Sequence, residues 1–261
     1  MKAAKGISIA ALHIICLAAH AQKLPNVQTV SIAAPAAIKV DGKPTEWNNS
    51  FQAFNHATGV YYTIANDAEN LYLVVQGTDV HTVEKIISGG VTFTIKNSDK
   101  KSNDIPVAIT FPFILPKSRF PIVQKIKEKN EDKPFDQDEL NKQLISAEKE
   151  IDVRGIKEIQ DTIISVYNDA GIIVATRVDS KKVLTYELSI PLKYLQQDID
   201  NKSALNYNIR LNPPRVISSA GMGMITVVGV SSIRRNSAAD SDFQDLMNAT
   251  DFSGTYTLAP K

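Results

Sequence analysis

The stretch that decides the fold reads IKVDGKPTEWNNSFQAF over residues 38–54 and GVYYTIANDAENLYLVVQGTD over residues 59–79. An Asp-Gly pair, which suits the positive φ angles of a tight turn, precedes the only Trp of the chain. Two runs rich in β-branched and aromatic residues follow at 60–65 and 71–78, joined by the polar segment NDAEN. Such runs on either side of a short polar turn predict an antiparallel β-hairpin.

Short β runs separated by turn residues continue through much of the chain. Val91, Phe93 and Ile95 alternate on one strand face, and residues 162–167 and 172–178 flank the turn NDAG as a second predicted hairpin. We also expect a half-buried strand at 183–190, one helical turn at 192–195, and strands at 206–211, 224–230 and 251–258. Many short strands and few helices predict an all-β protein, an antiparallel β-sandwich of the jelly-roll or immunoglobulin-like kind.

The middle of the chain departs from this pattern. Residues 105–121 contain prolines among hydrophobic residues, which favours edge strands and irregular segments, and the mixed charges of residues 125–133 indicate a solvated loop. Asp136 and Glu139 form a capping-box pair. Apolar residues follow at helical spacing, namely Leu140, Leu144, Ala147 and Ile151. We therefore predict a short helical insertion at about 116–159 that packs against the sandwich, with partner binding as its alternative role.

The N-terminal residues predict export. Lys2 and Lys5 form a positively charged start, residues 7–18 form a mostly apolar run, and Ala19-His20-Ala21 is a small-x-small cleavage site. The expected location is therefore periplasmic or extracellular. The expected segments are a cleavable signal peptide at 1–21, a flexible lead-in at 22–37 and one sandwich domain at 38–261.

Cleavage would change the chemistry available to the chain. The only Cys lies at position 16, so the mature protein would have neither a disulfide nor a thiolate nucleophile. Basic residues would fall from 29 to 27 against 28 acidic residues, which takes the formal net charge from +1 to −1. A near-neutral chain has no overall attraction for nucleic acid. No later run is apolar over the roughly 20 residues that a membrane span requires.

Three segments carry a family resemblance: Asp41-Gly42…Trp47, Asp67…Asn70-Leu71-Tyr72-Leu73, and Tyr186-Glu187-Leu188-Ser189-Ile190-Pro191-Leu192. In this order they resemble a carbohydrate-binding module of the family 9-like type. The chain is also similar to exported Bacteroidetes-type proteins that carry such a domain and nothing catalytic. The resemblance implies a secreted, non-catalytic β-sandwich that binds a polysaccharide or glycan, and it leaves the ligand and the oligomeric state open.

Sugar binding by such a module requires aromatic rings, because the C–H faces of a pyranose stack on π faces while polar groups bind its hydroxyls. The candidate ligand-binding residues are Tyr61, Tyr62, Tyr72 and the basic pair Arg234 and Arg235, which suits an anionic polysaccharide. Strand alternation places Tyr61 and Tyr62 on opposite faces of their sheet. Trp47 is expected to be structural, since Trp is usually buried.

Carboxylates in or beside turns are candidate ligands for a structural calcium ion, with turn formation and capping as their alternative role. These candidates are Asp41, Glu46, Asp67, Glu69 and Asp79. No other cofactor is predicted, because His56 and His81 are the only imidazoles outside the predicted signal peptide and zinc usually needs three or four ligands. The sequence has no Gly-x-Ser-x-Gly elbow and singles out no carboxylate pair, so we predict no enzyme activity.

Three functional hypotheses make different structural predictions. A carbohydrate-binding module requires an exposed face with at least one aromatic ring and several polar groups. A structural or protein-interaction domain of the cell envelope that has lost the sugar site requires that Trp47 and the tyrosines are buried. An enzyme with an unrecognised site requires a cleft with paired carboxylates of shifted pKa.

Overall fold

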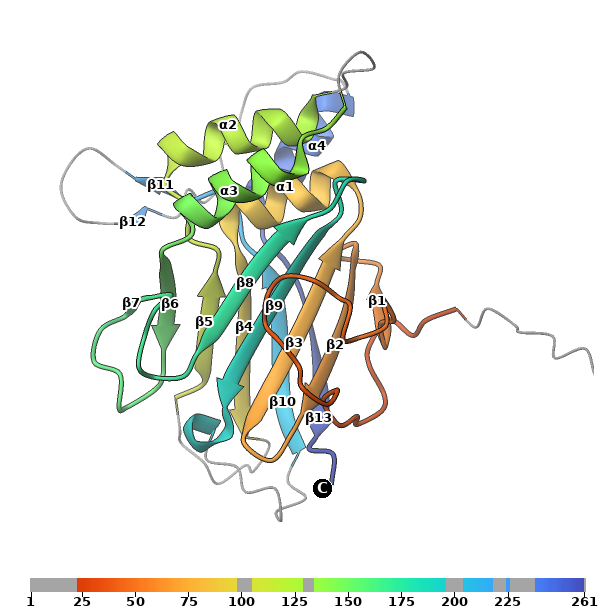
Figure 1. The fold of residues 1–261 in the computed structure, drawn as a ribbon, viewed down its shortest axis with the longest axis vertical. Coiled ribbons are helices and arrows are strands. Elements are labelled where there is room, and N and C mark those ends of the chain that lie inside the picture. The colour runs from red at the N-terminus through yellow and green to blue at the C-terminus, as the bar shows by residue number, and fades with distance from the viewer. Residues whose placement is uncertain are drawn as a thin grey trace, which may run out of the picture.

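The computed structural model describes residues 23–97, 105–128, 134–195, 204–217, 224–225 and 238–260. Two antiparallel sheets make up most of the protein, and helices form a layer at one end of them (Figure 1). This mostly β architecture is consistent with the predicted β-sandwich. Among the helices that the structure describes, none is long and apolar enough to cross a membrane.

The first sheet has five strands in the order β1-β2-β3-β9-β8. They are β1 (Ala53–Asn55), β2 (Val60–Asn66), β3 (Asn70–Gly77), β8 (Ile173–Val178) and β9 (Leu184–Pro191). β2 and β3 pair antiparallel with Tyr62 opposite Val75, which confirms the first predicted hairpin. Asp67 closes its turn, because Oδ1 accepts hydrogen bonds from the backbone N–H groups of Glu69 and Asn70, each at 2.7 Å.

The second sheet has six strands in the order β13-β10-β4-β5-β6-β7. They are β4 (Val91–Asn97), β5 (Val107–Phe111), β6 (Glu150–Arg154), β7 (Ile163–Ser165), β10 (Ala204–Leu211) and β13 (Thr250–Thr257). β10 and β13 confirm the strands predicted at 206–211 and 251–258. A separate pair, β11 (Val216–Ile217) and β12 (Met224–Ile225), includes the start of the strand predicted at 224–230, whose other residues lie outside the described part.

Two predictions about strand placement are wrong. The expected second hairpin does not form, because β7 pairs with β6 in the second sheet whereas β8 pairs with β9 in the first. Alternating residues identify a strand but do not determine which strand it pairs with. The segment that passes from β7 to β8 is held by the side-chain amide of Asn168, which donates to the backbone carbonyls of Ser165 and Ile172. β5 is an interior strand rather than an edge strand, since Pro106 and Pro112 lie just outside it.

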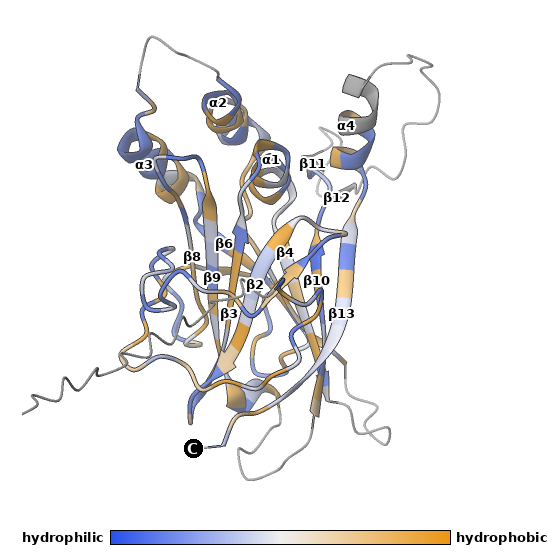
Figure 2. Ribbon diagram, turned by 90° about the vertical axis from the view of Figure 1, so that its right-hand side faces the viewer, coloured by the Kyte–Doolittle hydropathy of each residue, from blue (hydrophilic) through white to orange (hydrophobic). Residues whose placement is uncertain are grey.

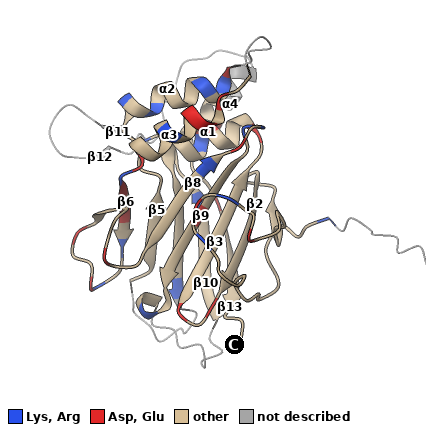
Figure 3. Cartoon of the chain, in the orientation of Figure 1, with Lys and Arg blue, Asp and Glu red and all other residues tan. Residues whose placement is uncertain are grey.

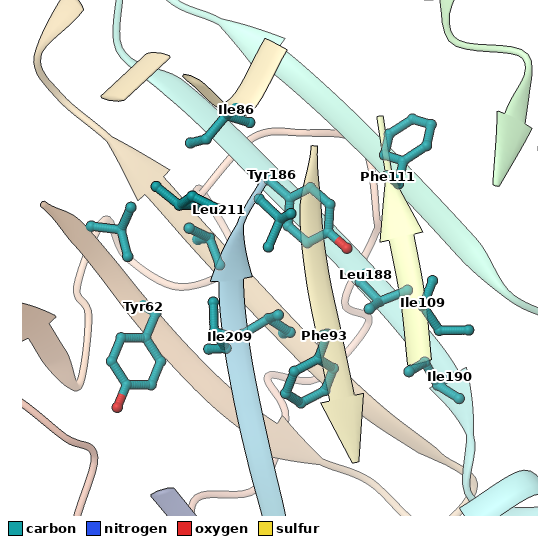
Figure 4. Close-up of a cluster of buried hydrophobic side chains, with 14 of the residues drawn as sticks. Tyr62, Ile86, Phe93, Ile109, Phe111, Tyr186, Leu188, Ile190, Ile209 and Leu211 are labelled. Atoms are coloured by element: carbon teal, nitrogen blue, oxygen red, sulfur yellow. The ribbon is translucent and has the colours of Figure 1, made fainter. Parts of the chain in front are cut away.

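The main core lies between the two sheets (Figure 4). Tyr62 of β2, Phe93 of β4 and Tyr186 of β9 point into it, and each is at most 1% exposed. The strand at 183–190 was predicted to be half-buried, but nearly every residue of β9 is buried. The reason is that the outer face of the first sheet is covered as well.

A second, smaller core covers that outer face. Its buried members are Trp47, Phe51, Ala65, Tyr72 and Val74, and apolar residues between positions 24 and 40 pack against them. The segment predicted as a flexible lead-in therefore packs against the sheet from Leu24 onward. Gln28 is 4% exposed, and its side-chain amide exchanges two hydrogen bonds with the backbone of Ile64, at 2.7 and 2.8 Å.

Four helices contribute to the layer seen at one end of the sheets in Figures 1 and 2. They are α1 (Val80–Gly89), α2 (Pro116–Lys127), α3 (Gln137–Ala147) and α4 (Ala238–Met247); the single turn η1 (Leu192–Leu195) lies apart from them and confirms the predicted turn. α3 confirms the predicted capping box, because Asp136 accepts a hydrogen bond from the backbone N–H of Glu139 at 2.9 Å. Figure 2 shows hydrophobic residues on the inward side of α1.

The helical content exceeds the prediction. α1 was not expected, although Asp79 caps it by accepting from the N–H of Thr82 and it buries Val83, Ile86 and Ile87 at helical spacing. α2 occupies the first residues of the predicted solvated loop. The predicted insertion at 116–159 is also not purely helical, because it contains β6, a strand of the second sheet.

Candidate binding surface

Three of the aromatic residues singled out in the sequence lie inside the protein. Trp47 is 6% exposed, Tyr62 is 0% exposed and Tyr72 is 7% exposed. The hydroxyl of Tyr62 lies 2.9 Å from that of Tyr207, and the hydroxyl of Tyr72 donates to Asp67 at 2.7 Å. Burial and the Asp67 carboxylate raise the pKa of Tyr72 to about 12. The ring faces of these three residues are used in packing and are not presented to a ligand.

Trp47 acts with Glu187 to attach the Asp-Gly…Trp segment to the middle of the first sheet. The indole Nε1 donates to Oε1 of Glu187 at 2.9 Å, and the backbone N–H groups of Asp41 and Gly42 donate to Oε2 at 2.9 and 2.8 Å. Burial raises the pKa of the Glu187 carboxyl, while the three hydrogen bonds act in the opposite direction. Gly42 has a φ of 77°, and a Cβ there would lie 2.7 Å from Cβ of Arg177. This segment is a scaffold element.

Tyr61, in contrast, belongs to a group of aromatic rings at the edge of the outer face. Phe54 of β1 is directly opposite Tyr61 of β2, with ring centroids 4.5 Å apart. The ring of His56 follows at 4.9 Å from that of Phe54. Phe54 and Tyr61 are partly exposed and His56 is exposed. We call these three residues the β1 aromatic surface.

Asn26 determines how the imidazole of this surface can hydrogen-bond. The side-chain oxygen of Asn26 accepts a hydrogen bond from the backbone N–H of His56 at 2.8 Å. This amide atom must therefore be the oxygen, which can only accept hydrogen bonds. The same oxygen lies 3.2 Å from Nδ1 of His56. Nδ1 must then carry a proton to bond with it, which in the neutral ring leaves Nε2 as an acceptor for a ligand hydroxyl.

The sequence analysis did not select Phe54 or His56. Phe54 lies in the middle of β1, and His56 is the turn residue that follows this strand. The contact of Phe54 with Tyr61 depends on the register of β1 against β2, which becomes visible only in the folded sheet. The resemblance directed attention to the Trp and the tyrosines instead.

The calcium candidates do not lie together. They act separately in turns and caps: Asp41 accepts from the N–H of Lys43, Glu46 from the hydroxyl of Thr45, Asp67 from the N–H groups of Glu69 and Asn70, and Asp79 from the N–H of Thr82. Across the described ranges, no three His, Cys, Asp or Glu side chains are grouped as a metal site would require.

The buried carboxylates have separate partners. Glu148 is 6% exposed and accepts a hydrogen bond from the hydroxyl of Thr176, and burial raises the pKa of Glu148 to about 8. Asp152 is 3% exposed and binds Arg154 at 3.0 Å and Arg215 at 3.5 Å. Together with Glu187, these groups stabilise different contacts, and no hydrogen bond joins two of them in the part of the chain that the structure describes.

Charged side chains are concentrated on the helices and loops, whereas the strands of both sheets carry few (Figure 3). His81 of α1 lies 2.6 Å from Asp245 of α4, and Lys85 lies 3.3 Å from the same carboxylate, so this histidine joins two helices. The candidate pair Arg234 and Arg235 lies outside the described residues.

The fold defines a mostly β protein with two antiparallel sheets, a helical layer at one end and a partly exposed aromatic surface at one sheet edge. The chain matches no protein-family model, no curated protein and no solved structure.

Proposed function

We propose that the protein is a secreted, non-catalytic carbohydrate-binding-like module and that its ligand stacks on the β1 aromatic surface. The observation that carries this proposal is the contact of Phe54 with Tyr61 and His56 at a partly exposed sheet edge. The rings are tilted by 42° and 73° relative to Phe54, so they offer faces in more than one direction. Aromatic faces of this kind pack against the C–H faces of sugars.

Polar groups beside the rings support the same function. Nε2 of His56 is an acceptor when Nδ1 faces Asn26, and the phenolic hydroxyl of Tyr61 both donates and accepts. A sugar needs such groups because its hydroxyls lose water on binding and each must be hydrogen-bonded again. None of these side chains is a carboxylate, so the surface suits binding rather than glycoside hydrolysis, which uses two acidic groups.

The proposal includes three further points. The chain is exported by a cleavable signal peptide to the periplasm or the exterior, as its N-terminal pattern predicts. The two sheets belong to a sandwich of the jelly-roll or immunoglobulin-like kind. Any calcium that the protein binds has a structural role and does not contact the ligand.

Binding of the mature protein to a glycan array, with and without calcium, tests this proposal. A glycan that binds is then titrated against the wild type, Phe54→Ala and the control Tyr167→Ala. Tyr167 is 79% exposed and lies outside the β1 aromatic surface. We expect Phe54→Ala to weaken binding at least about tenfold, equivalent to about 1.4 kcal/mol, and Tyr167→Ala to leave it unchanged. The absence of binding to any glycan, or equal losses in both variants, would refute the proposal.

A second candidate function is that of a structural or protein-interaction domain of the cell envelope. It is favoured by the burial of Trp47, Tyr62 and Tyr72 and by exposed apolar side chains on the helical layer, such as Phe120, which is 67% exposed. This function predicts that Phe120→Ser reduces crosslinking to an envelope protein whereas Phe54→Ala does not. The opposite result would favour the carbohydrate-binding function.

A further inference from the structure

The edges of the two sheets differ in how they are protected. An edge strand has unpaired backbone N–H and C=O groups that can bind another strand, and proteins usually shorten, cover or charge such edges. In the described sheets, β1 and β8 are the edges of the first sheet, and β7 and β13 are the edges of the second.

Two of these edges are short, and a third is covered at one end. β1 has three residues, and the backbone N–H of Phe54 already donates to the carbonyl of Pro25 at 3.0 Å. β7 also has three residues. The end of β8 is blocked by the side-chain amide of Asn141, which donates to the carbonyl of Val178 at 2.8 Å and accepts from its N–H at 2.9 Å.

β13 has none of these protections. All eight of its residues are in register with β10 on one side, and no backbone hydrogen bond from the described residues reaches its other side. Figure 2 shows β13 along the margin of the molecule, with β10 on one side of it and no described strand or helix on its other side. The strand contains neither Pro nor Lys, the residues that most often block an edge. Its one charged side chain, Asp251, accepts a hydrogen bond from Asn208 at 2.7 Å.

The sequence of β13 is complementary to itself in antiparallel orientation. In the register that places Gly254 opposite Gly254 of a second copy, the buried side chain of Phe252 in each copy is opposite the buried side chain of Tyr256 in the other. The twofold symmetry of the arrangement produces this aromatic pair twice. On the exposed face, Ser253 is opposite Thr255. Aromatic pairs and hydroxyl pairs at directly opposite positions stabilise antiparallel strands.

The charge pattern of β13 also permits this pairing. Asp251 lies opposite Thr257 in the same register, so no two like charges meet. Gly254, the residue that would pair with itself, is also required by packing within one chain. A Cβ at this position would lie 2.3 Å from the hydroxyl oxygen of Tyr207. The absence of a side chain there leaves the backbone free to approach that of the second copy.

We propose that β13 binds β13 of a second copy, so that the two six-stranded sheets join into one continuous sheet across a twofold axis. The partner is another molecule of this chain rather than an unrelated strand, because the complementarity lies within one sequence. The proposal is independent of the carbohydrate-binding function, since the β1 aromatic surface belongs to the other sheet.

Sedimentation equilibrium of the mature protein and two double variants tests the pairing. Ser253→Lys with Thr255→Lys puts lysine opposite lysine twice, whereas Ser253→Lys with Thr255→Glu puts lysine opposite glutamate twice. Both positions are exposed, so circular dichroism is expected to show the same fold in all three proteins. We expect a wild-type dimer, at least tenfold weaker dimerisation of the Lys/Lys variant, and recovery of the dimer in the Lys/Glu variant.

Each other result would overturn the proposal. A wild type that is monomeric at every concentration excludes self-association. A dimer that the Lys/Lys variant does not weaken must use a different surface. A Lys/Glu variant that dimerises no better than the Lys/Lys variant excludes the antiparallel register centred on Gly254.

Discussion

Replacing Glu148 by Gln is expected to make the stability of the protein less dependent on pH. Glu148 follows the last residue of α3, is 6% exposed and accepts one side-chain hydrogen bond, from Thr176. Burial raises the pKa of its carboxyl from 4.5 to about 8, against the smaller opposing effects of the Thr176 hydroxyl and of Lys149. Gln keeps the shape of the side chain and an oxygen for Thr176 but cannot ionise.

The sign of the effect follows from proton linkage. Below about pH 4.5 the carboxyl is protonated in both the folded and the unfolded chain, so its stabilising contribution is fully present. As the pH rises, the unfolded chain loses this proton first, and the contribution is lost progressively until the pH passes about 8. A difference of this size between the two pKa values corresponds to a loss on the order of 5 kcal/mol, at about 1.4 kcal/mol for each pKa unit.

Urea denaturation at a series of pH values from 5 to 9 measures this loss. The wild type and Glu148→Gln are expected to have similar free energies of unfolding near pH 5, and the variant is expected to become several kcal/mol more stable by about pH 8. Glu150→Gln is the matched control, because Glu150 is exposed and close in the chain. Parallel curves for the wild type and Glu148→Gln would refute the reasoning.

Two further substitutions test other buried polar groups. Trp47→Phe removes the donor to Oε1 of Glu187, and we expect a loss of about 2–3 kcal/mol at pH 7 in chemical denaturation. The loss is expected to be smaller at pH 4, because burial raises the pKa of the Glu187 carboxyl above its ordinary value of 4.5 and thereby favours the neutral form. An unchanged denaturation midpoint at pH 7 would contradict the scaffold role of this residue. Tyr186→Phe removes a buried hydroxyl that has no hydrogen-bond partner within the described structure, so we expect a gain of about 1 kcal/mol in thermal unfolding. A loss of similar size would mean that this hydroxyl is bonded.

Local features of the fold were predictable from the sequence. The β2–β3 hairpin follows from two β-rich runs and a turn in which Asp67 binds the N–H groups of residues two and three positions later. The start of α3 follows from Asp136, which accepts from a residue three positions later. Alternation also predicted that Tyr61 and Tyr62 lie on opposite faces of their sheet, and the two residues do belong to different cores. These features depend on side chains and backbone groups only a few residues apart.

Other features depend on residues far apart in the chain, and the sequence did not reveal them. Glu187 binds the backbone of Asp41 across 146 positions, and Trp47 contacts the same carboxylate across 140. No local pattern indicates that these groups meet. The same reason explains why the predicted hairpin of β7 and β8 was wrong. α1 was missed although it has local signals, namely the cap at Asp79 and the helical spacing of Val83, Ile86 and Ile87.

The sequence by itself thus determined the mostly β class, the first hairpin, the capped helix and a set of aromatic candidates, because periodicity and turn chemistry act over short distances. The tertiary structure decided which candidates are available. It buried Trp47, Tyr62 and Tyr72, placed the ring of Phe54 against those of Tyr61 and His56, and left β13 as the long unprotected edge in the described sheets. Burial and strand pairing decide both outcomes, and both depend on contacts between distant segments that local sequence patterns do not specify.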